Sequence, residues 1–90
     1  MALALIKVKI MPDSPQADLS EIEKNAQELL KRAECKIIKF EQEPIAFGLI
    51  AVIVMFSWDD TISNDEVVES LQRIKHVSSA EVIDYRRAIG

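Results

Sequence analysis

Cysteine and glycine are scarce in this 90-residue chain, which contains one cysteine and two glycines. A single cysteine can form neither an internal disulfide nor the C-x-x-C pair of a metal carrier, so both classes are excluded. Neither glycine lies at the first strand-helix turn, where small-ligand sensors usually need one. We expect Cys35 to be a small, half-buried residue rather than a nucleophile, because no neighbour in the sequence would lower its pKa.

Long apolar runs and an excess of positive charge are also missing. The longest uncharged stretch, residues 44–58, is shorter than the roughly 20 residues that span a bilayer, and two early lysines interrupt any signal-peptide pattern. The formal net charge of −4 repels phosphate backbones and anionic membranes. We therefore expect a cytoplasmic protein that binds neither nucleic acid directly nor membranes.

What the chain does contain is the composition and patterning of one globular domain over residues 1–90. Ile6, Val8 and Ile10 alternate with lysines, which predicts a half-buried strand over residues 3–11. After a Pro-containing break, Asp18 can cap a helix, and Glu21 follows three residues later. Apolar residues then recur at spacings of three and four as far as Ala33, which predicts an amphipathic helix.

The second half of the chain repeats this alternation of strands and helices. A strand is predicted over residues 36–42, ending at Pro44, and a second, apolar on both faces, over residues 49–56. Ser63 and Glu66 indicate a capping box before a second helix. We expect His76 to close that helix, since a partial positive charge suits the helix dipole, and residues 80–87 to form a last strand.

The order of these elements predicts an α+β fold of the ferredoxin-like kind, β-α-β-β-α-β. A right-handed crossover for each β-α-β unit gives a four-stranded antiparallel sheet with two helices on one face, and the first and third strands in its centre. This fold serves several functions, so the fold alone assigns none.

Residues for covalent chemistry are not apparent. Asp59 and Asp60 are adjacent carboxylates, but neighbours in an extended turn point apart, and we interpret them as the end of a strand. The apolar strand carries one aromatic residue at its end, so RNA binding by base stacking is weakly supported. We predict no enzyme, no metal site and no cofactor.

Two surface features remain. Phe47, just before Gly48, lies on the tight connection between the second and third strands, where its ring either packs onto a helix or anchors a partner; residue type alone favours packing. Arg86 and Arg87 form a positive point on an acidic chain, and by default such a pair is a solvated strand end.

Two motifs resemble a known family. The stretch P-I-A-F-G, followed by an apolar strand and W-D-D, is similar to the P-[IV]-[GA]-[FY]-G motif, strand and acidic turn of the guanine-nucleotide exchange domain of translation elongation factor 1-beta. The segment HVSSAEVIDYRR is similar to the V-x-S-x-[DE]-[IV] segment of that family. The resemblance covers essentially the whole chain and is greatest to the short archaeal form.

The resemblance implies an exchange factor that promotes replacement of GDP by GTP on its partner, elongation factor 1-alpha. It implies that Phe47, beside Gly48, is the loop aromatic that wedges into the GTPase. It also implies that Arg87, with Arg86 as the alternative, is directed at the magnesium and phosphate region. A binding module of the same fold, either RNA-binding or a regulatory small-ligand domain, is the competing hypothesis.

Overall fold

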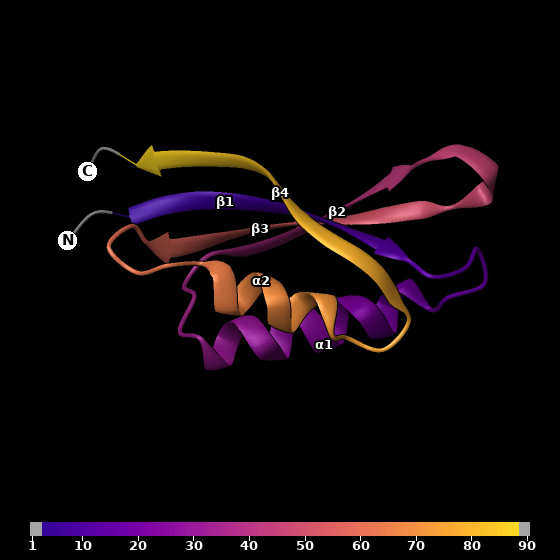
Figure 1. The fold of residues 1–90 in the computed structure, drawn as a ribbon, viewed down its shortest axis with the longest axis horizontal. Helices are drawn as coiled ribbons and strands as arrows, with labels where there is room; N and C mark the ends of the chain where they lie inside the picture. Colours follow the sequence, from indigo (N-terminus) through magenta and orange to yellow (C-terminus); the bar gives the residue numbers. More distant parts are fainter. Residues whose placement is uncertain (1–2, 89–90) are drawn as a thin grey trace.

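The computed structural model describes residues 3–88 as one sheet with two helices (Figure 1). The molecule measures 41 × 22 × 18 Å along its principal axes. Neither helix in residues 3–88 is long and apolar enough to cross a bilayer. In chain order the elements are β1 (Leu3–Pro12), α1 (Leu19–Arg32), β2 (Ile38–Pro44), the short turn η1 (Ala46–Gly48), β3 (Ile50–Asp59), α2 (Asp65–Gln72) and β4 (Val77–Ala88).

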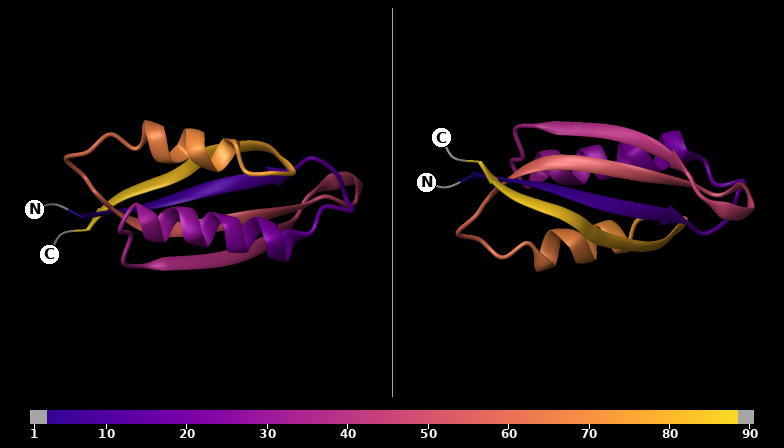
Figure 2. Two further views of the ribbon diagram at one scale, coloured as in Figure 1. Left: turned by 90° about the horizontal axis from the view of Figure 1, so that it is seen from below. Right: turned by 90° about the horizontal axis from the view of Figure 1, so that it is seen from above.

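The sheet is antiparallel throughout, with the strand order β2-β3-β1-β4. The predicted ferredoxin-like arrangement is therefore confirmed, including the central position of β1 and β3. Leu3 pairs with Asp59 of β3 and with Ala88 of β4, so β1 starts where β3 and β4 end. Both helices cover the same face of the sheet, and the other face is uncovered (Figure 2).

The core lies between the covered face and the helices. Every second residue of β1, from Ala4 to Ile10, is fully buried, as the alternation predicted. Helix α1 adds Ile22, Ala26 and Leu30 from one stripe. Phe56 of β3 is fully buried, and the half-buried Trp58 stands edge-on to its ring, with the ring centroids 6.1 Å apart.

The ends of the helices match the sequence in one case and differ in the other. Asp18 caps α1 as predicted, since its Oδ1 accepts a hydrogen bond from the Glu21 amide at 3.3 Å. The capping box predicted for α2 is wrong, because the N-cap is Asn64 and Ser63 Oγ accepts a hydrogen bond only from the Asp65 amide. The prediction that His76 closes α2 is wrong as well. The helix ends at Gln72, and His76, with a φ of +70°, lies where the chain turns towards β4.

The strands run further than the sequence indicated. β3 continues from Phe56 through Asp59, because Trp58 still packs inward while Ser57 lies on the alternate face. β4 begins at Val77 rather than residue 80, and β2 is shifted to Ile38–Pro44. Pairing with β1 continues through Ser57 to Asp59, so the polar side chain of Ser57 does not end β3.

Ser57 holds the connection between α1 and β2 against the sheet. The Oγ of Ser57 accepts hydrogen bonds from the amides of Lys36 at 3.0 Å and Ile37 at 3.1 Å. Ser57 is only 5% exposed. These two amides therefore depend on one side chain for their pairing.

We expect Ser57→Ala to lower the free energy of unfolding by about 1–3 kcal/mol, since it leaves partly buried amides unpaired. Urea denaturation monitored by circular dichroism measures the change. Ser70→Ala is the matched control, because the Ser70 hydroxyl donates only to the carbonyl of Glu66 within α2. Equal midpoints for Ser57→Ala and the parent protein would contradict this role of Ser57.

Candidate functional site

The turn between β2 and β3 presents Phe47 to solvent. The Leu49 amide donates to the Ala46 carbonyl at 3.3 Å, which closes a four-residue turn, and the Ile45 amide donates to the Leu49 carbonyl at 2.7 Å. Phe47 has a φ of +62° and Gly48 a φ of +75°, the signs that a type I′ hairpin turn requires at its two central positions. The turn thus projects the ring away from both strands.

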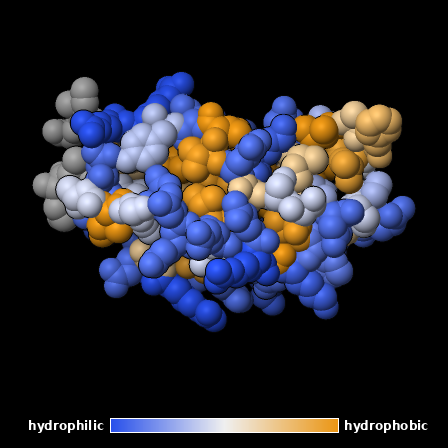
Figure 3. Space-filling model, viewed as in Figure 1, coloured by the Kyte–Doolittle hydropathy of each residue, from blue (hydrophilic) through white to orange (hydrophobic). Residues whose placement is uncertain are grey.

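The ring of Phe47 is not buried against the rest of the described chain. The residue is 93% exposed, more than any other large hydrophobic residue that the structure describes. The space-filling view shows apolar residues gathered at this end of the molecule, over the β2–β3 turn (Figure 3). A bulky residue with left-handed backbone costs about 1–2 kcal/mol, so neither packing nor backbone conformation accounts for phenylalanine here.

Gly48 supplies the conformational freedom that the turn needs. A Cβ at this position would lie 3.9 Å from the Cβ of Pro15, which is ordinary van der Waals contact. The requirement for glycine therefore comes from its positive φ and not from lack of space.

Arg86 and Arg87 lie at the far end of β4 on opposite faces of the sheet. Arg86 is opposite Leu5 on the uncovered face, and its Nε binds Asp84 Oδ2 at 3.1 Å. Arg87 is two residues beyond Tyr85 on the covered face, and its Nε binds Asp60 Oδ2 at 2.8 Å. Both arginine side chains are more than 70% exposed, so each guanidinium is reachable from solvent.

Asp60, interpreted from the sequence only as part of the end of a strand, binds two residues of β4. Its side chain is only 10% exposed, and its second oxygen accepts a hydrogen bond from the hydroxyl of Tyr85. That hydrogen bond raises the pKa of Tyr85 above its ordinary value, because losing the phenolic proton would place two negative charges side by side. The spacing of Tyr85 and Arg87, two apart on one face of a predicted strand, is the signal that could have drawn attention to a shared partner.

The neighbouring carboxylate has different partners. Asp59 Oδ1 accepts from the hydroxyl of Thr61 at 2.7 Å and from its amide at 2.9 Å, and these hydrogen bonds lower the pKa of Asp59. The two aspartates therefore point apart, as expected for adjacent residues. Within residues 3–88 no group of three or more His, Cys, Asp and Glu residues is arranged to hold a metal ion.

The structure does not bring Phe47 and the arginines together. β3 joins the turn that carries Phe47 to the end where Asp60 binds Arg87, and ten strand residues at about 3.3 Å each separate the two ends by roughly 30 Å. A partner that contacts both must therefore extend along the long axis of the sheet (Figure 1).

The uncovered face of the sheet lacks aromatic residues. All five aromatic residues of the chain lie within residues 3–88, and none is on that face. Tyr85 is opposite Ile6 on the covered face, Phe40 and Trp58 pack against the core, Phe56 is within it, and Phe47 is in the turn. A hollow of about 180 Å³ on the uncovered face is lined instead by Leu5, Lys7, Met55, Asp84 and Arg86. Stacking of RNA bases has no platform there.

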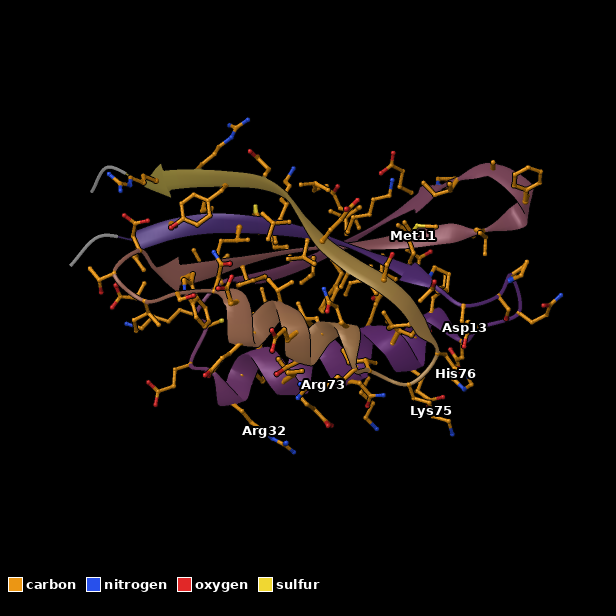
Figure 4. The ribbon with its side chains drawn as sticks, in the orientation of Figure 1. Met11, Asp13, Arg32, Arg73, Lys75 and His76 are labelled. Carbon is orange, nitrogen blue, oxygen red and sulfur yellow. The ribbon has the colours of Figure 1, made fainter. Side chains whose placement is uncertain are left out.

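His76 lies away from both ends of this arrangement. Its Nδ1 is 3.5 Å from Asp13 Oδ2, and the Asp13 amide donates to the His76 carbonyl at 2.9 Å. Figure 4 shows the two side chains next to each other where the β1–α1 and α2–β4 connections meet. The pair joins the β1–α1 and α2–β4 connections, which gives it a structural role.

A larger hollow of about 430 Å³ lies beside Trp58, between the α1–β2 connection and the β3–α2 turn. Two polar side chains on its wall, those of Trp58 and Ser57, already have partners in the protein. The indole N–H of Trp58 donates to the Ile62 carbonyl at 2.9 Å, and Ser57 Oγ accepts from two amides. Cys35, half-buried near the same connection, has a pKa raised by burial, so its thiol stays protonated.

Comparison with known proteins gives one family. The family model of the EF-1 guanine nucleotide exchange domain matches residues 5–88. Elongation factor 1-beta of Methanothermobacter thermautotrophicus is 42% identical over 81 residues, which cover 89% of this chain and 90% of that protein. Elongation factor 1-beta of Methanobrevibacter smithii is 38% identical over 88 residues, covering 97% of this chain and 98% of that protein.

Solved structures share the fold without close sequence similarity. The C-terminal domain of a cyclometallase involved in synthesis of the NPN cofactor of lactate racemase superposes with a TM-score of 0.63 at 10% identity, over 99% of this chain and 58% of that one. The de novo designed protein Foldit4 gives a TM-score of 0.61 at 20% identity, over 98% of both chains. These likenesses concern the arrangement of strands and helices alone.

The left-handed backbone of Gly48 leads to a prediction about stability. We expect Gly48→Ala to lower the free energy of unfolding by about 1–2 kcal/mol, because alanine resists a positive φ. Gly48→Asn is the comparison variant and should lose less, since asparagine tolerates this conformation. Chemical denaturation of the three proteins ranks them, and an alanine variant as stable as the parent would show that the turn does not require this φ.

Proposed function

Because the chain belongs to the EF-1 guanine nucleotide exchange domain family, as the two sequence motifs indicated, we propose that it accelerates release of GDP from elongation factor 1-alpha. Membership of the family assigns the chain to guanine-nucleotide exchange in translation elongation. The proposal adds the partner, the direction of exchange and the residues that act.

The observation that carries the proposal is the exposure of Phe47. An aromatic ring that is 93% exposed on a strained turn is available to fill an apolar pocket of a partner. Aromatic side chains supply much contact area for few rotatable bonds, and the closed turn holds this one in advance of binding. We assign Phe47, with Gly48 holding its turn, as the anchor on the GTPase.

A cation at the opposite end provides the second contact. Magnesium and phosphate groups are held in a GTPase largely by electrostatic interactions, so a guanidinium that competes for the phosphates weakens the nucleotide. Arg87 is the assigned cation and Arg86 the alternative, and both side chains are exposed. Anchoring at one end and competing at the other fits a partner that lies along the sheet.

This mode of action makes or breaks no covalent bond, so the protein acts as an exchange factor and not as an enzyme. A factor that weakens GDP binding is itself bound more weakly when a nucleotide is present, because the coupling between two ligands is reciprocal. The complex with the nucleotide-free GTPase therefore dissociates when GTP binds.

The test is release of a fluorescent GDP analogue from elongation factor 1-alpha of the same organism. A catalytic amount of this protein should speed release, and Phe47→Asn should reduce the rate by roughly tenfold or more, as expected for an interface anchor. Asparagine tolerates the left-handed backbone, so the thermal midpoint of the variant should equal or exceed that of the parent protein.

Two results would contradict the proposal. The parent protein could leave the release rate unchanged, which would exclude exchange on this GTPase. Phe47→Asn could keep full activity, which would exclude the turn as anchor. Ile62→Asn is the matched control, since Ile62 is another exposed apolar residue, 56% accessible, in the β3–α2 turn, and should retain activity.

A further inference from the structure

Asp60 links the β3–α2 turn to β4, two segments that lie far apart in the sequence. Its carboxylate lies in the turn between β3 and α2, and both of its oxygens bind residues of β4. The oxygens of a side chain that is nine-tenths buried need hydrogen-bond partners, and the guanidinium of Arg87 and the hydroxyl of Tyr85 provide them. The end of β4 is thereby fixed to the body of the domain.

The ion pair leaves most of the Arg87 guanidinium available. Within the part of the chain that the structure describes, Arg87 pairs with Asp60 through Nε, and its side chain is 75% exposed. The two terminal nitrogens of a guanidinium carry four N–H donors. They remain for oxygen atoms of a partner, while the bond at Nε sets the direction in which they point.

The other arginine is held differently. The partner of Arg86 is Asp84, two residues back on the same strand, and that carboxylate is 36% exposed. An ion pair between residues of one strand moves with the strand and fixes nothing relative to the other elements. An exposed pair of this kind also stabilises little.

We infer that Asp60 is a positioning residue that, together with Tyr85, orients Arg87, so that Arg87 and not Arg86 is the cation presented to the GTPase. This inference rests on the proposed function. An arginine loses more side-chain freedom than most residues when a partner immobilises it, and a guanidinium oriented in advance avoids part of that loss.

The experiment is a double-mutant cycle in the GDP-release assay. Asp60→Asn keeps the shape of the side chain but weakens its hold on Arg87, and should lower kcat/KM for exchange about tenfold. Arg87→Gln should lower it at least as much, and Asp60→Asn should have no further effect in the Arg87→Gln background, because both changes remove one interaction. Tyr85→Phe should give a smaller loss that also disappears in that background.

Asp84→Asn is the matched control, because it removes the carboxylate that binds the other arginine, and it should leave exchange unchanged. Thermal midpoints of all variants separate loss of function from loss of fold. Full activity of Asp60→Asn, or an equal loss with and without Arg87, would overturn the inference while leaving the proposed function intact. No acceleration by the parent protein would overturn both.

Tyr85 gives a readout that does not need the GTPase. It is the one tyrosine of the chain, so tyrosinate absorbance reports it alone. Its pKa is raised in the folded protein, so the hydrogen bond to Asp60 is present below the ordinary pKa of tyrosine and is lost as the pH rises through the raised value. Asp60→Asn should bring the pKa of Tyr85 back towards the ordinary value, and an unchanged titration would exclude the contact in solution.

Discussion

The pairing of β3 with a neighbour on each side is the constraint on which the rest of the molecule depends. Its register with β1 and β2 fixes the length of the sheet, and the same ladder places the Phe47 turn at one end and Asp60 at the other. Packing on the covered face then fixes which side chains of β4 point towards Asp60, because alternation along a strand leaves no freedom once Tyr85 lies opposite Ile6.

The positive charges of Arg86 and Arg87 on this acidic protein act at short range and do not create a long-range positive field. The net charge of −4 opposes any general attraction to phosphate, yet an exposed guanidinium on each face ends β4. Each arginine has a carboxylate within hydrogen-bonding distance, so neither attracts anions at long range. A cation of this kind acts only after another contact has brought the partner close. An apolar anchor such as Phe47 can provide that first contact.

The sequence predicted the fold well where one period dominates. The alternation of β1 and the stripe of α1 gave the core, and the two-sided hydrophobicity of β3 gave its central position. The ends of elements were predicted less well: the strand expected over residues 49–56 continues to Asp59, the first of the two aspartates interpreted as its end, and the helix cap expected at Ser63 is Asn64. His76 was wrongly predicted to end the helix, because its actual partner, Asp13, lies far away in the chain and no local pattern indicates that contact.

The sequence by itself determined the order of elements, the family and the identity of the exposed candidates, because periodicity and short motifs are local properties that neighbouring residues record. Only the tertiary structure decided that Phe47 points into solvent and that Arg87, unlike Arg86, is bound to a carboxylate of another element. Those outcomes follow from turn geometry and strand register. Register brings Asp60 to β4 through pairings between distant segments, and no local pattern encodes such a meeting.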